Sequence, residues 1–379
     1  MSNTTLSVPQ GEFTLHRYPL RNNDQLRAWD AADELLLDYV NDLDPKLLHK
    51  DCRVLIINDQ FGALSTALHR LEPSMLSDSF IAQQATLNNI ENNKLTAVNL
   101  ISSLEPLAGI YDLVLIKVQK SLAQLEDQLH RLRAHLSPQS VVIGAAMVKM
   151  IHTSSLKLFD TIIGDTKTSL AKKKARLIFA QFNPHLDVKP NPFPKTFLLE
   201  EKNWSILNHA NVFSQGKLDI GCRFFIEHLP SSDKEQTIVD LGCGNGIVGL
   251  VAAQNNPHSL IEFYDESYMA VASARHNYLA MFAQQDKAKF HVDDCLSSAQ
   301  PASADIIFNN PPFHQQNAIG DFIARQMFKQ SYKVLKPKGE LWVIGNIHLD
   351  YAQTLKKLFG NCQKVATSKK FVILRAIKN

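Results

Sequence analysis

The segment Ala304–Gln316, ADIIFNNPPFHQQ, joins an apolar run to a short stretch of polar and rigid residues. An exocyclic amine or an amide is a weak nucleophile because its lone pair is delocalised. If the Asn310 side-chain oxygen and the Pro311 carbonyl each accept one N–H of such a nitrogen, its lone pair turns out of the plane. Pro311 and Pro312 have a fixed φ and no competing N–H, so they hold these acceptors in place. Phe313 could stack on a planar substrate. The segment predicts a site that positions a planar amine, although Asn-Pro-Pro is also a common turn at the end of a strand.

A glycine-rich loop, DLGCGNGIVG, runs from Asp240 to Gly249 between a strand pattern and a helix pattern. Glycine has no Cβ, so backbone N–H groups and a helix amino terminus can approach a nucleotide closely there. The loop lacks Gly-Lys-Ser/Thr, which excludes a phosphate-cradling P-loop. Gly244, Gly246 and Gly249 satisfy GxGxxG, so the glycines alone leave a dinucleotide site open.

Three acids favour S-adenosylmethionine, which carries an ammonium and a sulfonium but no phosphate. Asp240 precedes the loop and suits a cation, Asp265 follows the next strand and could accept ribose hydroxyls, and Asp294 could accept from the adenine amino group. We expect Asp240 to be a surface acid at the sheet edge, so that alanine there would leave the fold intact. The alternative is a set of edge acids without a ligand. The predicted donor-binding residues in this stretch are Asp240, Gly242, Cys243, Gly244, Asn245, Gly246, Asp265 and Asp294.

The elements that must position these residues follow from an alternation of strand and helix patterns. A hairpin is predicted within 197–213 and a helix from Asp219, and strands and helices then alternate from Thr237 to Ile377. This order is typical of a parallel sheet that helices cover on both faces. Open sheets of this kind bind ligands at the carboxyl ends of their strands, where the glycine loop and the Asn-Pro-Pro segment would meet.

The first half of the chain repeats this order in a degenerate form. Four segments match in sequence, beginning at Arg53, Ser77, Tyr111 and Leu136. Aligning Gly62 with Gly246 puts Ile56 opposite Asp240, with Asn58 and Asp59 opposite Gly242 and Cys243. Aligning Asp112 with Asp305 puts 117–120 opposite the NPPF residues. The fold class is therefore α/β, with two tandem Rossmann-like domains of which the first has lost its chemistry.

Prolines mark the boundary between the two halves. Residues 184–194 contain four prolines, which excludes a helix and favours an extended connection. We expect a degenerate domain over 1–188, a linker over 189–196 and a catalytic domain over 197–379.

Positive charge is concentrated in the first half. Residues 116–190 hold 12 Lys and Arg against 5 Asp and Glu, although the whole chain has a net charge of only +3. Such a run is more often a solvated face than a binding surface, but it also fits a polyanion. His314 could be a base contact, a general base or merely structural. The residues assigned to RNA binding are Lys117, Lys120, Lys172, Lys173, Lys174, Arg176 and His314.

The composition excludes several other classes of protein. Five scattered cysteines without a CxxC pair argue against a disulfide framework or a zinc site, and no metal is expected. The amino terminus shows no signal-peptide pattern, and no apolar run is long enough for a membrane span. These observations predict a soluble protein of the cytoplasm.

The motifs NHANVFSQGKLDIGCRFF, VDLGCGNG, YDES and NPPFHQQ resemble the class I S-adenosylmethionine-dependent methyltransferases, and more narrowly the bacterial ribosomal RNA guanine-N2 methyltransferases. The likeness covers the whole chain, since that family also has a degenerate first copy, and it favours the large-subunit enzymes over their small-subunit relatives. It implies methyl transfer to the exocyclic N2 of a guanine in 23S rRNA. It assigns donor binding to the acids and glycines above, a place near the donor to Phe213, and substrate positioning to Asn310, Pro311, Pro312 and Phe313. Ala210-Asn211 departs from the glycine common in relatives, which weakens only the assignment of the Phe213 loop.

Other readings remain open from the residues alone. The same chemistry could act on small-subunit rRNA, DNA adenine or protein glutamine, although relatives with the last two substrates usually carry Tyr at the position of Phe313 and lack a first copy. A non-catalytic protein that binds RNA through both halves is the second alternative, and the intact Asp240, Asp265 and NPPF speak against it.

Overall fold

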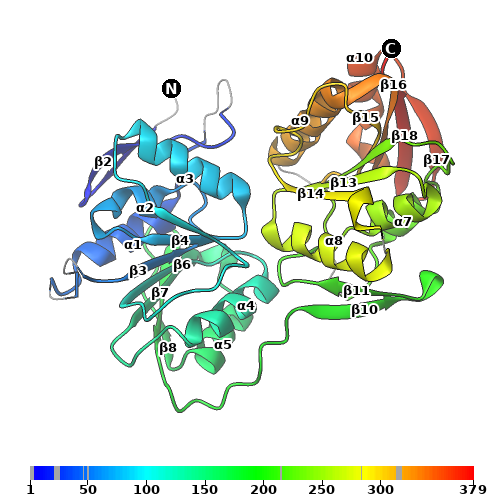
Figure 1. Cartoon of the computed structure of the whole chain (residues 1–379). Coiled ribbons are helices and arrows are strands. Elements are labelled where there is room, and N and C mark those ends of the chain that lie inside the picture. Colours follow the sequence, from blue (N-terminus) through cyan, green and yellow to red (C-terminus); the bar gives the residue numbers. More distant parts are fainter. Residues whose placement is uncertain are drawn as a thin grey trace. The chain divides into compact units, whose positions relative to one another are not determined.

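The computed structural model of the chain describes residues 4–20, 26–45, 47–48, 51–213, 216–282, 284–312 and 318–379. The chain forms two compact units, Met1–Phe193 and Pro194–Asn379, and the division falls in the proline-rich segment. Figure 1 shows that each unit is built around its own sheet, with helices against the sheet. Among the described residues, no helix combines the length and apolar character that a membrane crossing requires.

The first unit is a seven-stranded sheet with the strand order β5-β4-β3-β6-β7-β9-β8, preceded by a small β1–β2 hairpin. Its strands and helices are β1 (Thr5–Val8), β2 (Gly11–Thr14), α1 (Ala31–Asn41), β3 (Val54–Ile57), α2 (Ala63–Ala67), β4 (Ser74–Ser77), α3 (Phe80–Asn92), β5 (Asn99–Ser102), β6 (Leu113–Lys117), α4 (Leu122–Arg133), β7 (Val141–Met147), α5 (Thr153–Ile162), β8 (Thr166–Thr168) and β9 (Ala175–Gln181).

The second unit has a seven-stranded sheet with the strand order β14-β13-β12-β15-β16-β18-β17, and the β10–β11 hairpin precedes it in the sequence. Its elements are β10 (Lys195–Leu199), β11 (Trp204–Asn208), α6 (Ile220–Ile226), β12 (Thr237–Leu241), α7 (Ile247–Asn255), β13 (Leu260–Asp265), α8 (Tyr268–Met281), β14 (Ala288–Val292), β15 (Ala304–Asn309), α9 (Ala318–Val334), β16 (Leu335–Asn346), the 3₁₀ turn η5 (Ile347–Leu349), α10 (Tyr351–Phe359), β17 (Gln363–Thr367) and β18 (Phe371–Ile377).

The two sheets have the same topology, which confirms the predicted tandem α/β architecture. In each sheet, the first five strands in the order pair in parallel, and the sixth strand, β9 or β18, pairs antiparallel with both of its neighbours, so it alone runs in the opposite direction. The prediction of a parallel sheet is therefore correct for the five strands that form the candidate site. β17 and β18 cannot be parallel, because only the short segment 368–370 connects them.

Backbone conformation confirms the alignment of the two halves. Gly62 and Gly246 both precede a helix with left-handed φ values of 78° and 85°. Asn58 and Gly242 are also left-handed, at 63° and 75°. The register agrees as well, since Ile56 pairs with Leu115 in the first sheet and Asp240 pairs with Phe308 in the second.

Close packing fixes the start of α7 against its neighbours. A Cβ on Gly249 would lie 2.2 Å from the Phe263 ring, and a Cβ on Gly246 would lie 2.9 Å from the Ala274 Cβ. Any larger side chain would push α7 away from β13 and α8. These two glycines therefore serve packing, which leaves the earlier glycines of the loop to face a ligand.

Candidate active site

The loop between β12 and α7 exposes its backbone at Gly244. The Gly242 and Cys243 N–H groups donate to the Tyr264 carbonyl at 2.8 and 3.0 Å, which ties the loop to β13. Gly242 and Gly244 have φ values of 75° and 54°, in the left-handed region. A Cβ on Gly244 would meet no atom within 4 Å, so this part of the loop has open space on the side where the Cβ would lie.

Asp240 lies beneath this loop rather than at the surface. Its side chain is 3% exposed, and its Oδ2 accepts the Gly249 N–H at 2.8 Å. The expectation of a surface acid is wrong, because β12 is the middle strand between β13 and β15 and α7 covers its end. Burial, with the charge of Asp265 adding, raises the pKa of Asp240 to about 7, although the Gly249 N–H favours the ionised form.

Asp265 supports the loop from the end of β13. Its Oδ2 accepts the Gly244 N–H at 3.0 Å and its Oδ1 accepts the Ser267 N–H at 3.0 Å. The described residues contain no ion pair of Asp240, so a carboxylate with a raised pKa is buried without a cationic partner. Such a group fits a cationic ligand better than an anionic one. The site therefore fits the positive charges of S-adenosylmethionine and disfavours a pyrophosphate.

Asp294 lies on the same edge of the sheet, after β14. Its side chain is 4% exposed, and its Oδ1 accepts from the Gln326 Nε2 of α9 at 2.8 Å. The next residue of α9, Met327, lies with its Cε 3.3 Å from the position of a Gly242 Cβ. The sequence does not mark Gln326 and Met327 as site residues, because on a helix pattern they are not distinguishable from ordinary packing residues.

The Asn-Asn-Pro-Pro segment reaches the loop from β15. Asn309 is fully buried, and its Nδ2 donates to the Leu241 carbonyl at 3.0 Å, which joins the ends of β15 and β12. The Asn310 carbonyl lies 3.9 Å from the Gly242 Cβ position. The Asn310 Oδ1 is buried and accepts no hydrogen bond in the described part of the chain. The structure thus brings Asn310 next to the glycine loop, with Pro311 following it in the chain, while Phe313 and His314 lie outside the described residues.

The β10–β11 hairpin is fastened to the same loop by amide side chains. The Asn245 Nδ2 donates to the Asn208 Oδ1 at 3.0 Å, and the Asn277 Nδ2 donates to the carbonyls of Leu207 and Asn245 at 2.9 Å each. Phe213 follows this hairpin and is 74% exposed. The structure therefore connects the hairpin to the donor loop, and Phe213 presents a free aromatic ring to solvent.

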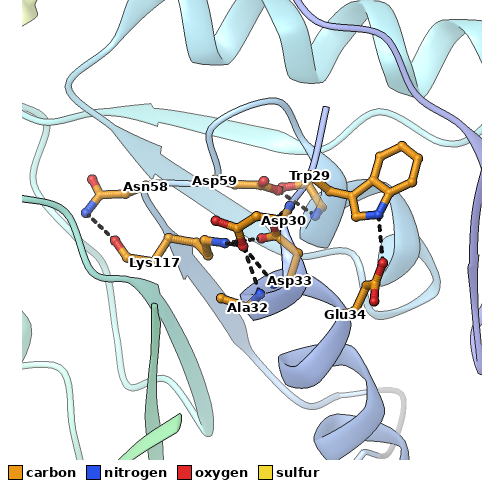
Figure 2. A network of polar contacts seen from close by, with 9 residues as sticks. Trp29, Asp30, Ala32, Asp33, Glu34, Asn58, Asp59 and Lys117 are labelled. Atoms are coloured by element: carbon orange, nitrogen blue, oxygen red, sulfur yellow. Dashed lines mark hydrogen bonds and ion pairs between the residues drawn. The ribbon is translucent and has the colours of Figure 1, made fainter. Parts of the chain in front are cut away.

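At the corresponding edge of the first unit, an ion-pair cluster around Lys117 stands where the second unit has Asn310 (Figure 2). The Lys117 Nζ lies 2.9 Å from Asp30 Oδ1 and 2.7 Å from Asp33 Oδ1, and its side chain is 12% exposed. The assignment of Lys117 to RNA binding is wrong. The carboxyl end of β6 faces the amino end of α1, and the Lys117 ammonium is ion-paired there with Asp30 and Asp33. Burial raises the pKa of Asp33 to about 6, and the negative charges of Asp30 and Asp59 act in the same direction. The positive charge of Lys117 only partly offsets this rise.

The first unit also lacks acids at the positions of Asp240 and Asp265. Ile56, fully buried, occupies the position of Asp240, and Ser77 ends β4 where Asp265 ends β13. Lys117 stands in the alignment where Asn310 stands in the second unit. No residue of this cluster reproduces the acceptor that Asn310 presents.

The other predicted RNA contacts lie at the surface of the first unit to different degrees. Lys120 and the run 172–174 are exposed, whereas Arg176 is partly buried. Lys172 pairs with Asp38 at 2.9 Å and Lys173 pairs with Glu34 at 2.8 Å, so part of the charge of the run is compensated. These surface pairs are weak, and a phosphate could replace the carboxylates.

The fold and the site define a class. A glycine loop after the middle strand, acids at the ends of three neighbouring strands, and Asn-Pro-Pro after the fourth identify the second unit as a class I S-adenosylmethionine-dependent methyltransferase domain. The family model "Methyltransferase small domain" matches residues 203–375, and the model "RLMG N-terminal domain" matches residues 3–184.

Similar proteins narrow the class to a family. The ribosomal RNA large subunit methyltransferase G of Pseudoalteromonas translucida is 48% identical, covering 97% of this chain and 96% of that protein. The protein of the same name from Erwinia tasmaniensis is 48% identical and the one from Streptomyces griseus is 46% identical. In both comparisons the match covers 98% of this chain and 99% of the relative. The chain belongs to the ribosomal RNA large subunit methyltransferase G family.

A solved structure confirms the fold over the whole chain. The 16S rRNA N2 methyltransferase RsmC of T. thermophilus, in complex with AdoMet and guanosine, superposes with a TM-score of 0.76 at 20% identity, covering 99% of this chain and 98% of that one. The tandem arrangement is therefore shared by both proteins.

Proposed function

We propose that this protein transfers a methyl group from S-adenosylmethionine to the exocyclic N2 of a specific guanine in 23S rRNA, in the cytoplasm. The observation that carries the proposal is the buried Asn310 Oδ1, which accepts no hydrogen bond among the described residues, on a residue whose backbone carbonyl lies beside the glycine loop. A buried acceptor without a donor costs free energy, so its retention favours a ligand that supplies an N–H. The names of the relatives support the large-subunit RNA as the substrate.

Three carboxylates are proposed to bind the donor. Asp240, buried without a cation, neutralises the positively charged methionine part, and Asp265 and Asp294 accept from the ribose and the adenine at successive strand ends. The bound donor supplies an electrophilic methyl group on its sulfonium. Gly244, which has open space where a Cβ would lie, leaves room for the donor beside the loop.

The Asn310 and Pro311 oxygens act on the acceptor nitrogen. When the Asn310 Oδ1 and the Pro311 carbonyl each accept one N–H of the guanine amino group, the lone pair of N2 points away from the ring and toward the methyl group. The proton that N2 carries after transfer is lost to solvent or to a neighbouring acceptor. Positioning of this kind needs no strong base, which is consistent with a segment in which rigid prolines follow the asparagine. Phe313, Phe213 and His314 are proposed to contact the RNA around the flipped guanine.

The test replaces Asn310 while keeping the fold. Asn310→Ala removes the acceptor, so methyl transfer to unmodified 23S rRNA should fall at least tenfold, about 1.4 kcal/mol in the barrier, while donor affinity measured by calorimetry stays the same. Asn310→Asp keeps the oxygen acceptors and is the matched control, which should retain more activity than the alanine variant. Alanine turnover within tenfold of the wild type would show that the role is misassigned.

A further inference from the structure

A cavity of about 260 Å³ opens at the carboxyl end of β16, and no residue that lines it takes part in the site described above. Arg325 of α9 forms one side, and η5 with the first turn of α10 forms the other. The polar lining residues are Arg325, His348, Asp350, Tyr351, Gln353 and Thr354.

The strand order places this cavity on the acceptor side of the active site. Donor-binding residues follow β12, β13 and β14, Asn310 follows β15, and the cavity follows β16, the next strand. Arg325 is also adjacent in α9 to Gln326, which holds Asp294. A polynucleotide whose target base enters at Asn310 therefore has its neighbouring nucleotides within reach of the cavity.

Cations border the cavity at the turn between β17 and β18. Lys369 and Lys370 are exposed there, and the Ile347 N–H of η5 donates to the Lys370 carbonyl at 3.0 Å, which holds the turn against the cavity wall. Ile347 itself is 51% exposed, an apolar surface on which a base could lie. Two lysines beside an exposed apolar side chain suit a nucleic acid strand better than a small anion.

The lining suits a nucleobase rather than a phosphate. Arg325 and Gln353 are side chains that bond the edges of purines, and the Asp350 carboxylate accepts from an amino group but would repel a phosphate. His348 offers a flat ring for stacking. The cavity thus combines donors and acceptors in the way that base recognition requires, and the lysines supply the contacts to the backbone.

We propose that the cavity holds an unpaired nucleotide next to the target guanine, with Lys369 and Lys370 on its phosphates, and that it selects the target by its sequence context. This inference rests on the proposed function. Binding of this nucleotide makes and breaks no covalent bond. Loss of the cavity residues should therefore change the affinity for RNA and the preference for the nucleotides that flank the target.

The experiment uses the full-length protein and unmodified 23S rRNA transcripts in which each nucleotide flanking the methylated guanine is replaced in turn. For the wild-type protein, replacement of one of these flanking nucleotides should lower kcat/KM at least tenfold. Arg325→Ala with His348→Ala should lose a similar factor on the natural RNA and no longer distinguish that replacement, while affinity for S-adenosylmethionine stays the same. Both substituted residues are exposed, so the fold should persist.

Two lysine variants separate backbone contacts from base contacts. Lys369→Gln with Lys370→Gln should weaken the binding of all these RNAs by the same factor. It should also reduce the slope of log affinity against log salt by about 1.4, because each lost charge contributes roughly 0.7. Lys333→Gln with Lys338→Gln, at the opposite edge of the sheet, is the matched control and should leave the slope unchanged. An Arg325 and His348 variant that keeps wild-type kcat/KM and the wild-type context preference would overturn the proposal. If no 23S transcript is methylated by the wild type, the proposed function itself fails.

Discussion

The raised pKa of Asp240 makes donor binding depend on pH in a defined direction. In the free protein the pKa is about 7, mainly because of burial. A cationic ligand beside this carboxylate binds its ionised form, so affinity for S-adenosylmethionine should rise with pH until Asp240 is ionised and then level off. With a pKa of about 7, the ionised fraction increases about 25-fold between pH 5.5 and 7.5, about 1.9 kcal/mol in binding free energy.

Calorimetry measures both the affinity and the protons released. At pH 5.5 the binding of S-adenosylmethionine should release nearly one proton per protein, detected by repeating the titration in buffers of different ionisation enthalpy. Asp240→Asn replaces the ionisable carboxyl with a neutral amide, whose oxygen can still accept the Gly249 N–H. That variant should bind weakly, with little dependence on pH and no proton release. Asp240→Ala should in addition destabilise the unit, because it removes the acceptor of the Gly249 N–H.

Asp59→Asn is the matched control for Asp240→Asn. Asp59 is also a buried carboxyl with a pKa raised by burial, in the equivalent loop of the first unit. Its replacement should leave donor affinity and proton release unchanged. The reasoning is refuted if wild-type affinity is flat across this pH range, or if Asp240→Asn retains the wild-type pH dependence.

Two further predictions concern the first unit. Lys117→Met leaves Asp30 and Asp33 without a cation, so chemical denaturation should show the first unit destabilised by about 3–5 kcal/mol at pH 7. Because Asp33 with its raised pKa can take up a proton, this deficit should shrink toward pH 5, and a constant deficit would contradict the ion-pair explanation. Replacing Lys172, Lys173 and Lys174 by alanine should weaken rRNA binding and lower its salt slope by at most about 2, with donor affinity unchanged. An unaltered slope and affinity would mean that this run is only a solvated face.

The sequence was sufficient for the fold because strand and helix patterns alternate without ambiguity and occur twice. Matching Gly62 with Gly246 then aligned the two halves residue by residue, and both glycines are left-handed in the structure. The glycine loop and Asn310 were found as motifs, and the order of the strands predicted that they meet, since residues at the ends of neighbouring parallel strands lie at one edge. These predictions depended on topology, which hydrophobic periodicity encodes well.

Burial and partners could not be predicted in the same way. Asp240 and Lys117 are both charged residues at strand ends, where exposure is the usual expectation, yet tertiary packing buries Asp240 and leaves only 12% of the Lys117 side chain exposed. The partners of Lys117 come from α1, far away in the sequence and without a motif to mark them. The cavity at β16 could not be predicted for a similar reason. Arg325 and His348 belong to different elements, and only the fold brings them together.

The central claim is tested most directly by methyl transfer to a defined atom. The protein is incubated with labelled S-adenosylmethionine and 23S rRNA from cells that lack the enzyme, with 16S rRNA, DNA and protein offered in parallel, and the labelled RNA is digested to nucleosides. We expect label in 23S rRNA alone, as N2-methylguanosine from a single position. Label in adenosine, in 16S rRNA or in protein, or no label with intact donor binding, would contradict it.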